Sequence, residues 1–163
     1  TFNALLRISR LESEQKRGHF ADVNLKALLE DVVALYEPLA EDKNVTVNHM
    51  LEDITYNGDC DVLFQAYANL LDNAVKFTPS GGTITISLKR PDDVIYVSIA
   101  DTGGGVEEDE TEKIFNRFYR SEKSRNTDGT GLGLSVVAAV IHLHGGTIKA
   151  INTNPGLRII TVL

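Results

Sequence analysis

The chain has few of the residues that cross-link small proteins or anchor proteins in membranes. Its 163 residues include one cysteine, Cys60, which excludes a disulfide framework and a multi-cysteine zinc site. No apolar run approaches the ~20 residues that a membrane-spanning helix requires, and no segment has the pattern of a signal peptide. Apolar residues still make up 42% of the chain, which suffices for the core of one ordinary domain and is too much for a disordered protein.

Basic residues are also scarce relative to acidic ones. The chain has 16 lysines and arginines against 23 aspartates and glutamates, which gives a formal net charge of −7. An acidic chain is a poor general binder of polyanions, so nucleic acid and anionic lipid are not expected partners. A phosphate compound would have to be held by local groups, chiefly backbone N–H donors.

Hydrophobic periodicity predicts an α+β domain that follows a separate amphipathic helix. In residues 1–15, apolar residues recur at helical spacing. Further helices are predicted at residues 25–41, 59–77 and 131–143, and strands at 45–51, 54–56, 83–89, 94–100, 147–151 and 157–163. This order implies helices on one side of a mixed, largely antiparallel sheet.

The first motif with a chemical meaning is Asn69-Leu-Leu-Asp-Asn73-Ala-Val-Lys76-Phe77. Its four numbered residues share one face of the predicted helix. A carboxamide oxygen suits a hard magnesium ion, and a lysine suits phosphate as a point charge. A solvated helix face explains the two asparagines equally well, so the pattern alone leaves both interpretations open.

The second motif, Asp101-Thr-Gly103-Gly-Gly105, directly follows a predicted strand. The aspartate places a carboxylate acceptor beside backbone that a ligand can approach closely. Because a carboxylate repels phosphate, this corner is better suited to a base that donates from an amino group. A plain glycine-rich turn is the alternative.

The third motif, Gly129-Thr130-Gly131-Leu132-Gly133-Leu134-Ser135, opens the last predicted helix. Free N–H groups, the positive end of the helix dipole and absent side chains together suit an anion. The motif lacks the Gly-x-x-x-x-Gly-Lys pattern, and no strand immediately precedes it as in a dinucleotide fingerprint. It ends a connection that starts at Thr102, and so long a connection inside a domain is usually functional.

Together with Phe115-Asn-Arg-Phe118-Tyr-Arg120, these motifs resemble the N, first glycine, F and second glycine boxes of sensor histidine kinases, in the family's order and spacing. The resemblance covers residues 24–163. It implies the two-layer sandwich shared with gyrase, ninety-kilodalton heat-shock chaperones and mismatch-repair ATPases. That fold has a mixed, mostly antiparallel five-stranded sheet, three helices on one face and a long ATP lid. A short helix is expected at residues 113–118, with its two phenylalanines on one side.

The resemblance also implies a domain division and a set of partners. Residues 19–163 match the catalytic ATP-binding domain, and residues 1–18 match the end of the second dimerisation helix and a linker. The implied partners are the protein's own dimerisation domain with its phosphoacceptor histidine and a response regulator receiver domain. The full-length protein is then expected to be a homodimer, this fragment a monomer, and the chain the cytoplasmic portion of an inner-membrane sensor.

Site residues follow from the resemblance position by position. Asn73 matches the magnesium ligand, with Asn69 assisting, and Lys76 matches a phosphate contact. Phe77 matches an aromatic residue near the adenine. The expected adenine corner consists of Asp101, Gly103 and Gly105. The expected lid and phosphate residues are Arg117, Arg120, Gly129, Thr130, Gly131, Leu132, Gly133 and Leu134, and the expected catalytic residues are Asn69, Asn73, Lys76 and Arg117.

Two departures bear on the reaction. Related ATPases carry a glutamate as general base where this chain has Asn69, as histidine kinases usually do, so transfer to another group is expected rather than hydrolysis. None of the four histidines lies in a His-Glu-x-x-Thr-Pro context, and they are expected to be structural or surface residues. The phosphoacceptor histidine is therefore expected outside this chain. In addition, Arg158 stands where related chains often have glycine.

Two other functions remain as alternatives. One is a related serine kinase or anti-sigma-type switch, against which the apparent dimerisation-helix remnant argues. The other is a nucleotide-binding module without catalysis, against which the intact Asn73, Lys76 and glycine loop argue.

Overall fold

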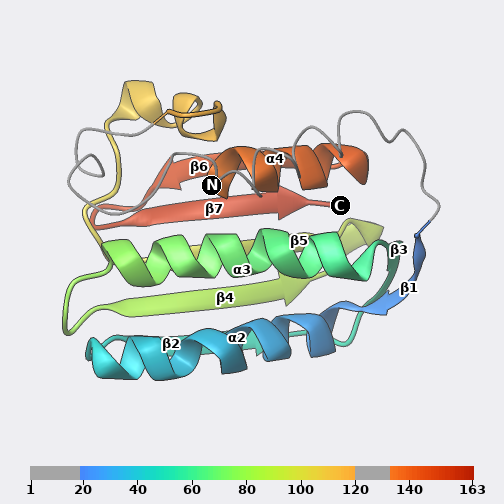
Figure 1. Ribbon diagram of the computed structural model, residues 1–163, viewed down its shortest axis with the longest axis horizontal. Helices are drawn as coiled ribbons and strands as arrows, with labels where there is room; N and C mark the ends of the chain where they lie inside the picture. Colours follow the sequence, from blue (N-terminus) through green and yellow to red (C-terminus); the bar gives the residue numbers. More distant parts are fainter. Residues whose placement is uncertain (1–18, 120–132) are drawn as a thin grey trace.

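A computed structural model describes residues 19–119 and 133–163, which form an α+β sandwich (Figure 1). The strands are β1 (Ala21–Asn24), β2 (Thr46–Leu51), β3 (Thr55–Gly58), β4 (Thr83–Lys89), β5 (Tyr96–Asp101), β6 (Thr147–Asn152) and β7 (Leu157–Val162). The α-helices are α2 (Leu25–Asp42), α3 (Cys60–Phe77) and α4 (Gly133–Leu143), and short 3-10 helices are η1 (Pro91–Asp93), η2 (Glu108–Glu110) and η3 (Lys113–Phe115).

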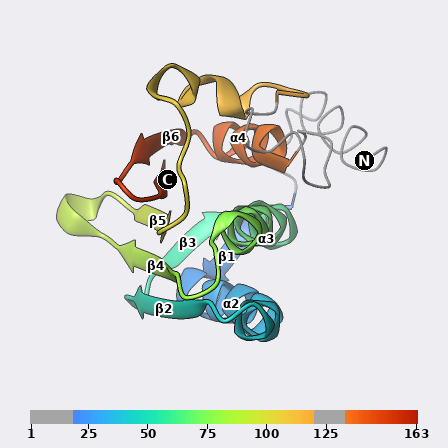
Figure 2. The ribbon, with the colours of Figure 1, turned by 90° about the vertical axis from the view of Figure 1, so that its left-hand side faces the viewer.

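Five strands form one sheet in the order β2-β4-β5-β7-β6. Only the β2–β4 pair is parallel, and the other three pairs are antiparallel. The helices α2, α3 and α4 cover one face of this sheet (Figures 1 and 2). The predicted fold class is therefore confirmed.

The alternation of side chains explains why the sheet is covered on one side. In β4, Ile84, Ile86 and Leu88 are at most 1% exposed and face the helices, whereas Thr85 and Ser87 face away. The same alternation runs through the other central strands, as expected for an antiparallel sheet that packs one face on a core. The predicted strand at residues 54–56 does not join this sheet, because β3 pairs with β1 in a separate two-stranded ribbon.

Side-chain caps determine where the first two helices begin. Asn24 accepts a hydrogen bond from the backbone N–H of Ala27 at the start of α2, and Asp59 accepts from the N–H of Asp61 at the start of α3. At the other end of α3, the ammonium of Lys43 donates to the carbonyl oxygens of two of its last residues, Val75 and Lys76, at 2.9 and 2.8 Å. Lys43 thus ties the end of α2 to the end of α3.

The short helix expected at residues 113–118 is a correction. It ends at Phe115, whereas Phe118 has a φ of 62° and a side chain that is 60% exposed. Phe115 instead packs against the core, so the two phenylalanines do not share a helix face. Nearby, the hydroxyl of Tyr119 donates to the buried carboxylate of Glu110. Among the described residues, no helix is both long enough and apolar enough to span a membrane.

Candidate nucleotide-binding site

The C-terminal end of α3, the end of β5 and the start of α4 lie at the same end of the domain (Figures 1 and 2). The side-chain nitrogen of Asn69 donates to the carbonyl oxygen of Gly133 at 3.5 Å, which joins the middle of α3 to the first residue of α4. The fold therefore brings together residues from all three sequence motifs.

Asp101 is held in place by backbone N–H groups. Its Oδ1 oxygen accepts from Gly103 at 2.9 Å and from Leu157 at 3.3 Å. Burial raises the pKa of this carboxyl group above its ordinary value, and these two hydrogen bonds offset part of that rise in pKa. Within the described residues, no donor reaches the Oδ2 oxygen, so this atom can accept from a ligand.

The glycines after Asp101 are required by the protein's own packing. A Cβ atom on Gly103 would overlap the carbonyl oxygen of Phe77, the last residue of α3. Gly105 has a φ of 66°, and a Cβ atom there would lie 2.6 Å from the Oδ1 atom of Asn152. The turn therefore lies against both α3 and the β6–β7 connection.

Asn152 is a residue at this corner that sequence reasoning did not identify. Its Oδ1 accepts from the N–H of Val106 at 3.0 Å, and its Nδ2 donates to the carbonyl of Val106 at 2.7 Å and to Glu108 at 2.9 Å. The amide thus pairs with the backbone as a neighbouring strand would. No sequence signal links two residues 46 positions apart in this way.

The expected ligand-binding face of α3 is partly exposed. Asn73 is half-buried, and within the described residues its carboxamide makes no hydrogen bond. Phe77 is 36% exposed. Lys76 forms an ion pair with Asp72 at 2.9 Å, in the i, i+4 arrangement of a helix surface. A phosphate group would have to compete with this carboxylate for the ammonium.

The available ligands fit a magnesium ion that is held mainly by phosphates. The described residues contain no cluster of three or more histidine, cysteine or acidic side chains that could hold a metal. A single hard oxygen, such as the accessible carboxamide of Asn73, is the type of ligand that Mg²⁺ takes alongside substrate phosphates and water.

Several expected site residues lie outside the described part of the chain. These are Arg120, Gly129, Thr130, Gly131 and Leu132. Arg117 is described and exposed. In α4, Gly133 is half-buried, and Leu134 packs its side chain against the core. Leu134 could therefore reach a ligand only through its backbone.

Comparisons with known proteins agree with this geometry. Residues 58–163 match the family described as "Histidine kinase-, DNA gyrase B-, and HSP90-like ATPase". The chain is 39% identical over 148 residues to the probable sensor protein PcoS of Escherichia coli, an alignment that covers 90% of this chain and 32% of PcoS. The chain thus spans about a third of the length of this relative.

Solved structures give the same result. The full-length histidine kinase ShkA in complex with AMPPNP matches with a TM-score of 0.86 and 29% identity, over 98% of this chain and 34% of that one. Histidine kinase ThkA in complex with the response regulator protein TrrA matches with a TM-score of 0.77 and 26% identity, over 99% of this chain and 47% of that one.

These matches define the class of protein. The chain belongs to the ATPase family of histidine kinases, DNA gyrase B and HSP90. Within that family its relatives are sensor kinases, and the chain is a histidine kinase catalytic domain that binds ATP.

Proposed function

We propose that this domain binds Mg–ATP and transfers the γ-phosphoryl group to a histidine on a dimerisation domain outside this chain. The observation that carries the proposal is the meeting of three elements at one end of the sandwich. These are the α3 face around Asn73, the oriented carboxylate of Asp101, and the start of α4.

The adenine would lie between Asp101 and the end of α3. The Oδ2 oxygen of Asp101 would accept from the adenine amino group, because Oδ1 is already engaged by two backbone N–H groups. Phe77 would contact the base. Gly103 and Gly105 would keep the turn close to it.

The phosphates would lie over the second half of the α3 face and the N-terminus of α4. Asn73, assisted by Asn69, would hold Mg²⁺, and Lys76 would exchange its ion pair with Asp72 for a phosphate oxygen. When bound, Mg²⁺ offsets the negative charge of the phosphates. The loop from Gly129 to Leu134 would donate N–H groups, and Arg117 and Arg120 would neutralise charge on the terminal phosphate.

The reaction would move one phosphoryl group without hydrolysis. An imidazole nitrogen of the acceptor histidine attacks the γ-phosphorus, the bond from that phosphorus to the bridging oxygen breaks, and ADP leaves with the electron pair. Asn69 lacks the basicity to activate water, which favours transfer over hydrolysis.

The proposal extends to the whole protein. Residues 19–163 would be the catalytic domain, and residues 1–18 would be the end of a dimerisation helix and a linker. A response regulator receiver domain would take the phosphoryl group onward, as the ThkA complex with TrrA suggests by analogy. The full-length protein would be a homodimeric inner-membrane sensor, with this portion in the cytoplasm.

Two measurements test the proposal. Titration with Mg–ATP should shift backbone amide signals at Asn73, Asp101 and Gly133, whereas a titration with EDTA present should weaken the effect. Labelled ATP and a dimerisation domain supplied in trans should then yield an acid-labile phosphohistidine.

The outcomes separate the alternatives. ATP binding without any phosphoprotein would favour a non-catalytic nucleotide-binding module, and acid-stable phosphate on a partner would favour a serine kinase. Undisturbed amides at all three positions would remove the binding claim itself.

A further inference from the structure

The face of the five-stranded sheet opposite the helices, called the open face below, carries formal charge of one sign. Strand alternation places all three basic strand residues, Lys89, Lys149 and Arg158, on this face, because the residues next to them pack toward the helices. The only acidic residue in the five strands is Asp101, which lies on the helix side with Ile99.

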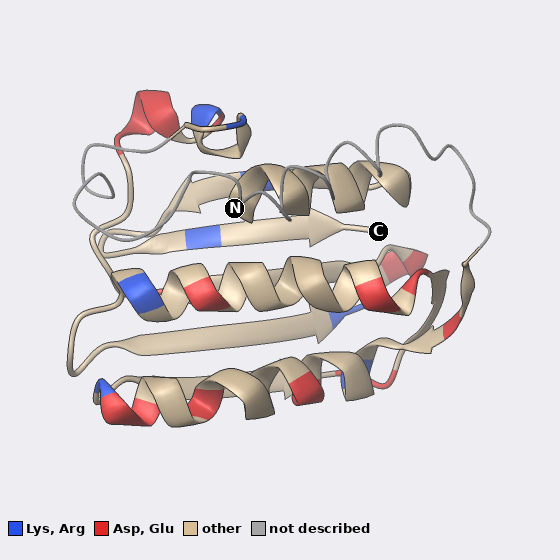
Figure 3. Ribbon diagram, viewed as in Figure 1, with Lys and Arg blue, Asp and Glu red and all other residues tan. Residues whose placement is uncertain are grey.

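This distribution is unusual for a chain with a net charge of −7. Figure 3 shows the acidic side chains mostly on the helices and connecting segments. The open face is therefore a basic region on an acidic domain.

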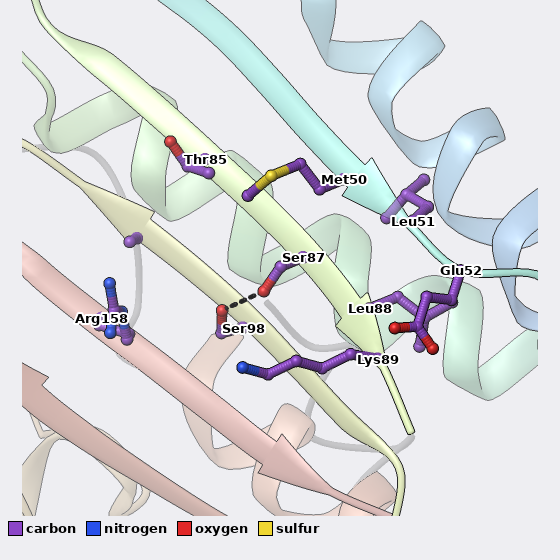
Figure 4. Close-up of a pocket in the computed structure, with 10 residues that line it drawn as sticks. Met50, Leu51, Glu52, Thr85, Ser87, Leu88, Lys89, Ser98 and Arg158 are labelled. Carbon is purple, nitrogen blue, oxygen red and sulfur yellow. Dashed lines mark hydrogen bonds between the residues drawn. The ribbon is translucent and has the colours of Figure 1, made fainter. Parts of the chain in front are cut away.

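The centre of the open face is a hollow of about 560 Å³ (Figure 4). Its floor consists of small side chains in cross-strand register, where Thr85 pairs with Ala100 and Ser87 pairs with Ser98. The two serine hydroxyls are hydrogen bonded at 2.7 Å. The hollow exists because these small residues lie on the central strands, between longer side chains on the strands at either side.

The longer side chains around the hollow are an exposed apolar residue and two cations. Met50, beside Ser87 on β2, is 67% exposed. Arg158 lies on β7, and Lys89 extends toward Ser98 (Figure 4). Glu52 also lines the hollow, but its carboxylate accepts a hydrogen bond from the backbone N–H of Arg90 at 3.2 Å.

We propose that the open face is a docking surface for an acidic segment of another protein. Carboxylates of the partner would lie against Lys89, Lys149 and Arg158, and an apolar side chain would contact Met50. The charge complementarity supplies orientation, and the apolar contact supplies burial.

The remainder of this chain does not supply the acidic segment. By sequence, residues 1–18 have more basic than acidic side chains, and so do residues 120–132. The counts rest on Arg7, Arg10, Lys16 and Arg17 against Glu12 and Glu14, and on Arg120, Lys123 and Arg125 against Glu122 and Asp128. Both segments have the same sign of charge as the open face, so the occupant must come from elsewhere.

A polyanion fits this surface less well than a protein segment does. Nucleic acid and anionic membranes present extended negative charge, which the acidic helices and loops around the open face would repel. An exposed methionine beside the hollow also has no partner on a phosphate backbone. A short segment with a few carboxylates around an apolar residue matches both features.

The test uses the whole chain labelled with ¹⁵N and a helical peptide of leucine, alanine and glutamate. A peptide with lysine in place of glutamate is the matched control. We expect the glutamate peptide to shift the amides of Thr85, Ser87, Ser98 and Ala100, with an affinity that falls as salt is added.

Charge-removing variants locate the contact. Arg158→Ala and Lys149→Ala should each reduce the affinity by up to about fivefold, the effect of one exposed charge pair. Lys113→Ala removes an exposed cation on η3 and should leave the affinity unchanged. None of these side chains is part of the core, so the variants should remain folded.

Several results would overturn the proposal. These are equal binding of the lysine peptide, absence of amide shifts on the open face, or preferential binding of duplex DNA or phosphatidylserine vesicles to the same amides. The titrations require no nucleotide, so their outcome is independent of the proposed kinase activity.

Discussion

The carbonyl oxygen of Phe77 lies where a Cβ atom on Gly103 would have to be, so the last residue of α3 and the turn after β5 are in direct contact. This contact fixes the expected metal and phosphate face relative to the expected adenine corner. The glycine is required because backbone cannot move aside as a flexible side chain would.

Gly103→Ala is therefore expected to damage both stability and binding. The added methyl group forces α3 and the turn apart, at a cost of about 1–3 kcal/mol in the free energy of unfolding. Urea denaturation measures this cost, and calorimetry measures the accompanying loss of Mg–ATP affinity. Unchanged stability and affinity would mean that the turn can move away from α3 freely.

Asp101→Asn should separate binding from folding. The asparagine Oδ1 can still accept from Gly103 and Leu157, but the charge is gone and an N–H donor faces the adenine amino group. ATP affinity should fall by about tenfold or more, since an unpaired buried polar group costs about 1–3 kcal/mol. Calorimetric titration measures the affinity, and Asp53→Asn, at an exposed position, is the control.

The same substitution has a defined effect on the pH dependence of stability. Burial raises the pKa of Asp101 in the folded state, so the folded state binds a proton more readily than the unfolded state does. The unmodified protein therefore loses stability as pH rises from the unfolded pKa through the raised one. Asp101→Asn should remove this loss, so that above this interval the variant is at least as stable by thermal denaturation. Lower stability of the variant there would contradict this account.

The pairing of Asn152 with Val106 gives a prediction about local dynamics. Asn152→Ala leaves the N–H and the carbonyl of Val106 without partners, so this segment should detach more often from β6. Amide hydrogen exchange at Val106 should accelerate by about tenfold or more, and Mg–ATP affinity should fall with it.

The control for that prediction is Asn48→Ala, which removes an exposed asparagine from β2. It should change neither the exchange at Val106 nor the affinity. Faster exchange at Val106 with unchanged affinity would mean that the segment does not help to position the nucleotide.

The parts of the fold that sequence predicted are those with a regular pattern. The helices α2 and α3 and the strand β4 have apolar residues at clear helical or alternating spacing, and their bounds differ from the prediction by no more than a residue at most ends. The site motifs could be found for a similar reason. Each motif combines unusual residue types within a few positions.

What sequence did not predict depends on contacts between distant residues. The ribbon of β1 and β3 consists of two short strands, and nothing local indicates that they pair with each other. Asn152 has no unusual neighbours that would mark its role. The open face could not be recognised either, because the common side of Lys89 and Arg158 becomes evident only from the strand register.

His144 joins three parts of the domain and gives a last prediction. Its Nε2 accepts from the backbone N–H of Asp59 at 3.0 Å, and its Nδ1 lies 2.8 Å from the carbonyl oxygen of Val140, to which it donates. The ring also stacks on Phe20, with centroids 4.7 Å apart. A neutral imidazole with its proton on Nδ1 satisfies both hydrogen bonds.

His144→Phe should keep the stacking and lose both hydrogen bonds. The N–H of Asp59 and the carbonyl of Val140 would then lack this partner, and the free energy of unfolding should fall by about 1–3 kcal/mol. His142→Phe, at an exposed position one turn from the end of α4, should change the stability much less. Equal stabilities of the two variants in urea denaturation would mean that the aromatic stack, rather than the hydrogen bonds, holds the start of α3 against the end of α4.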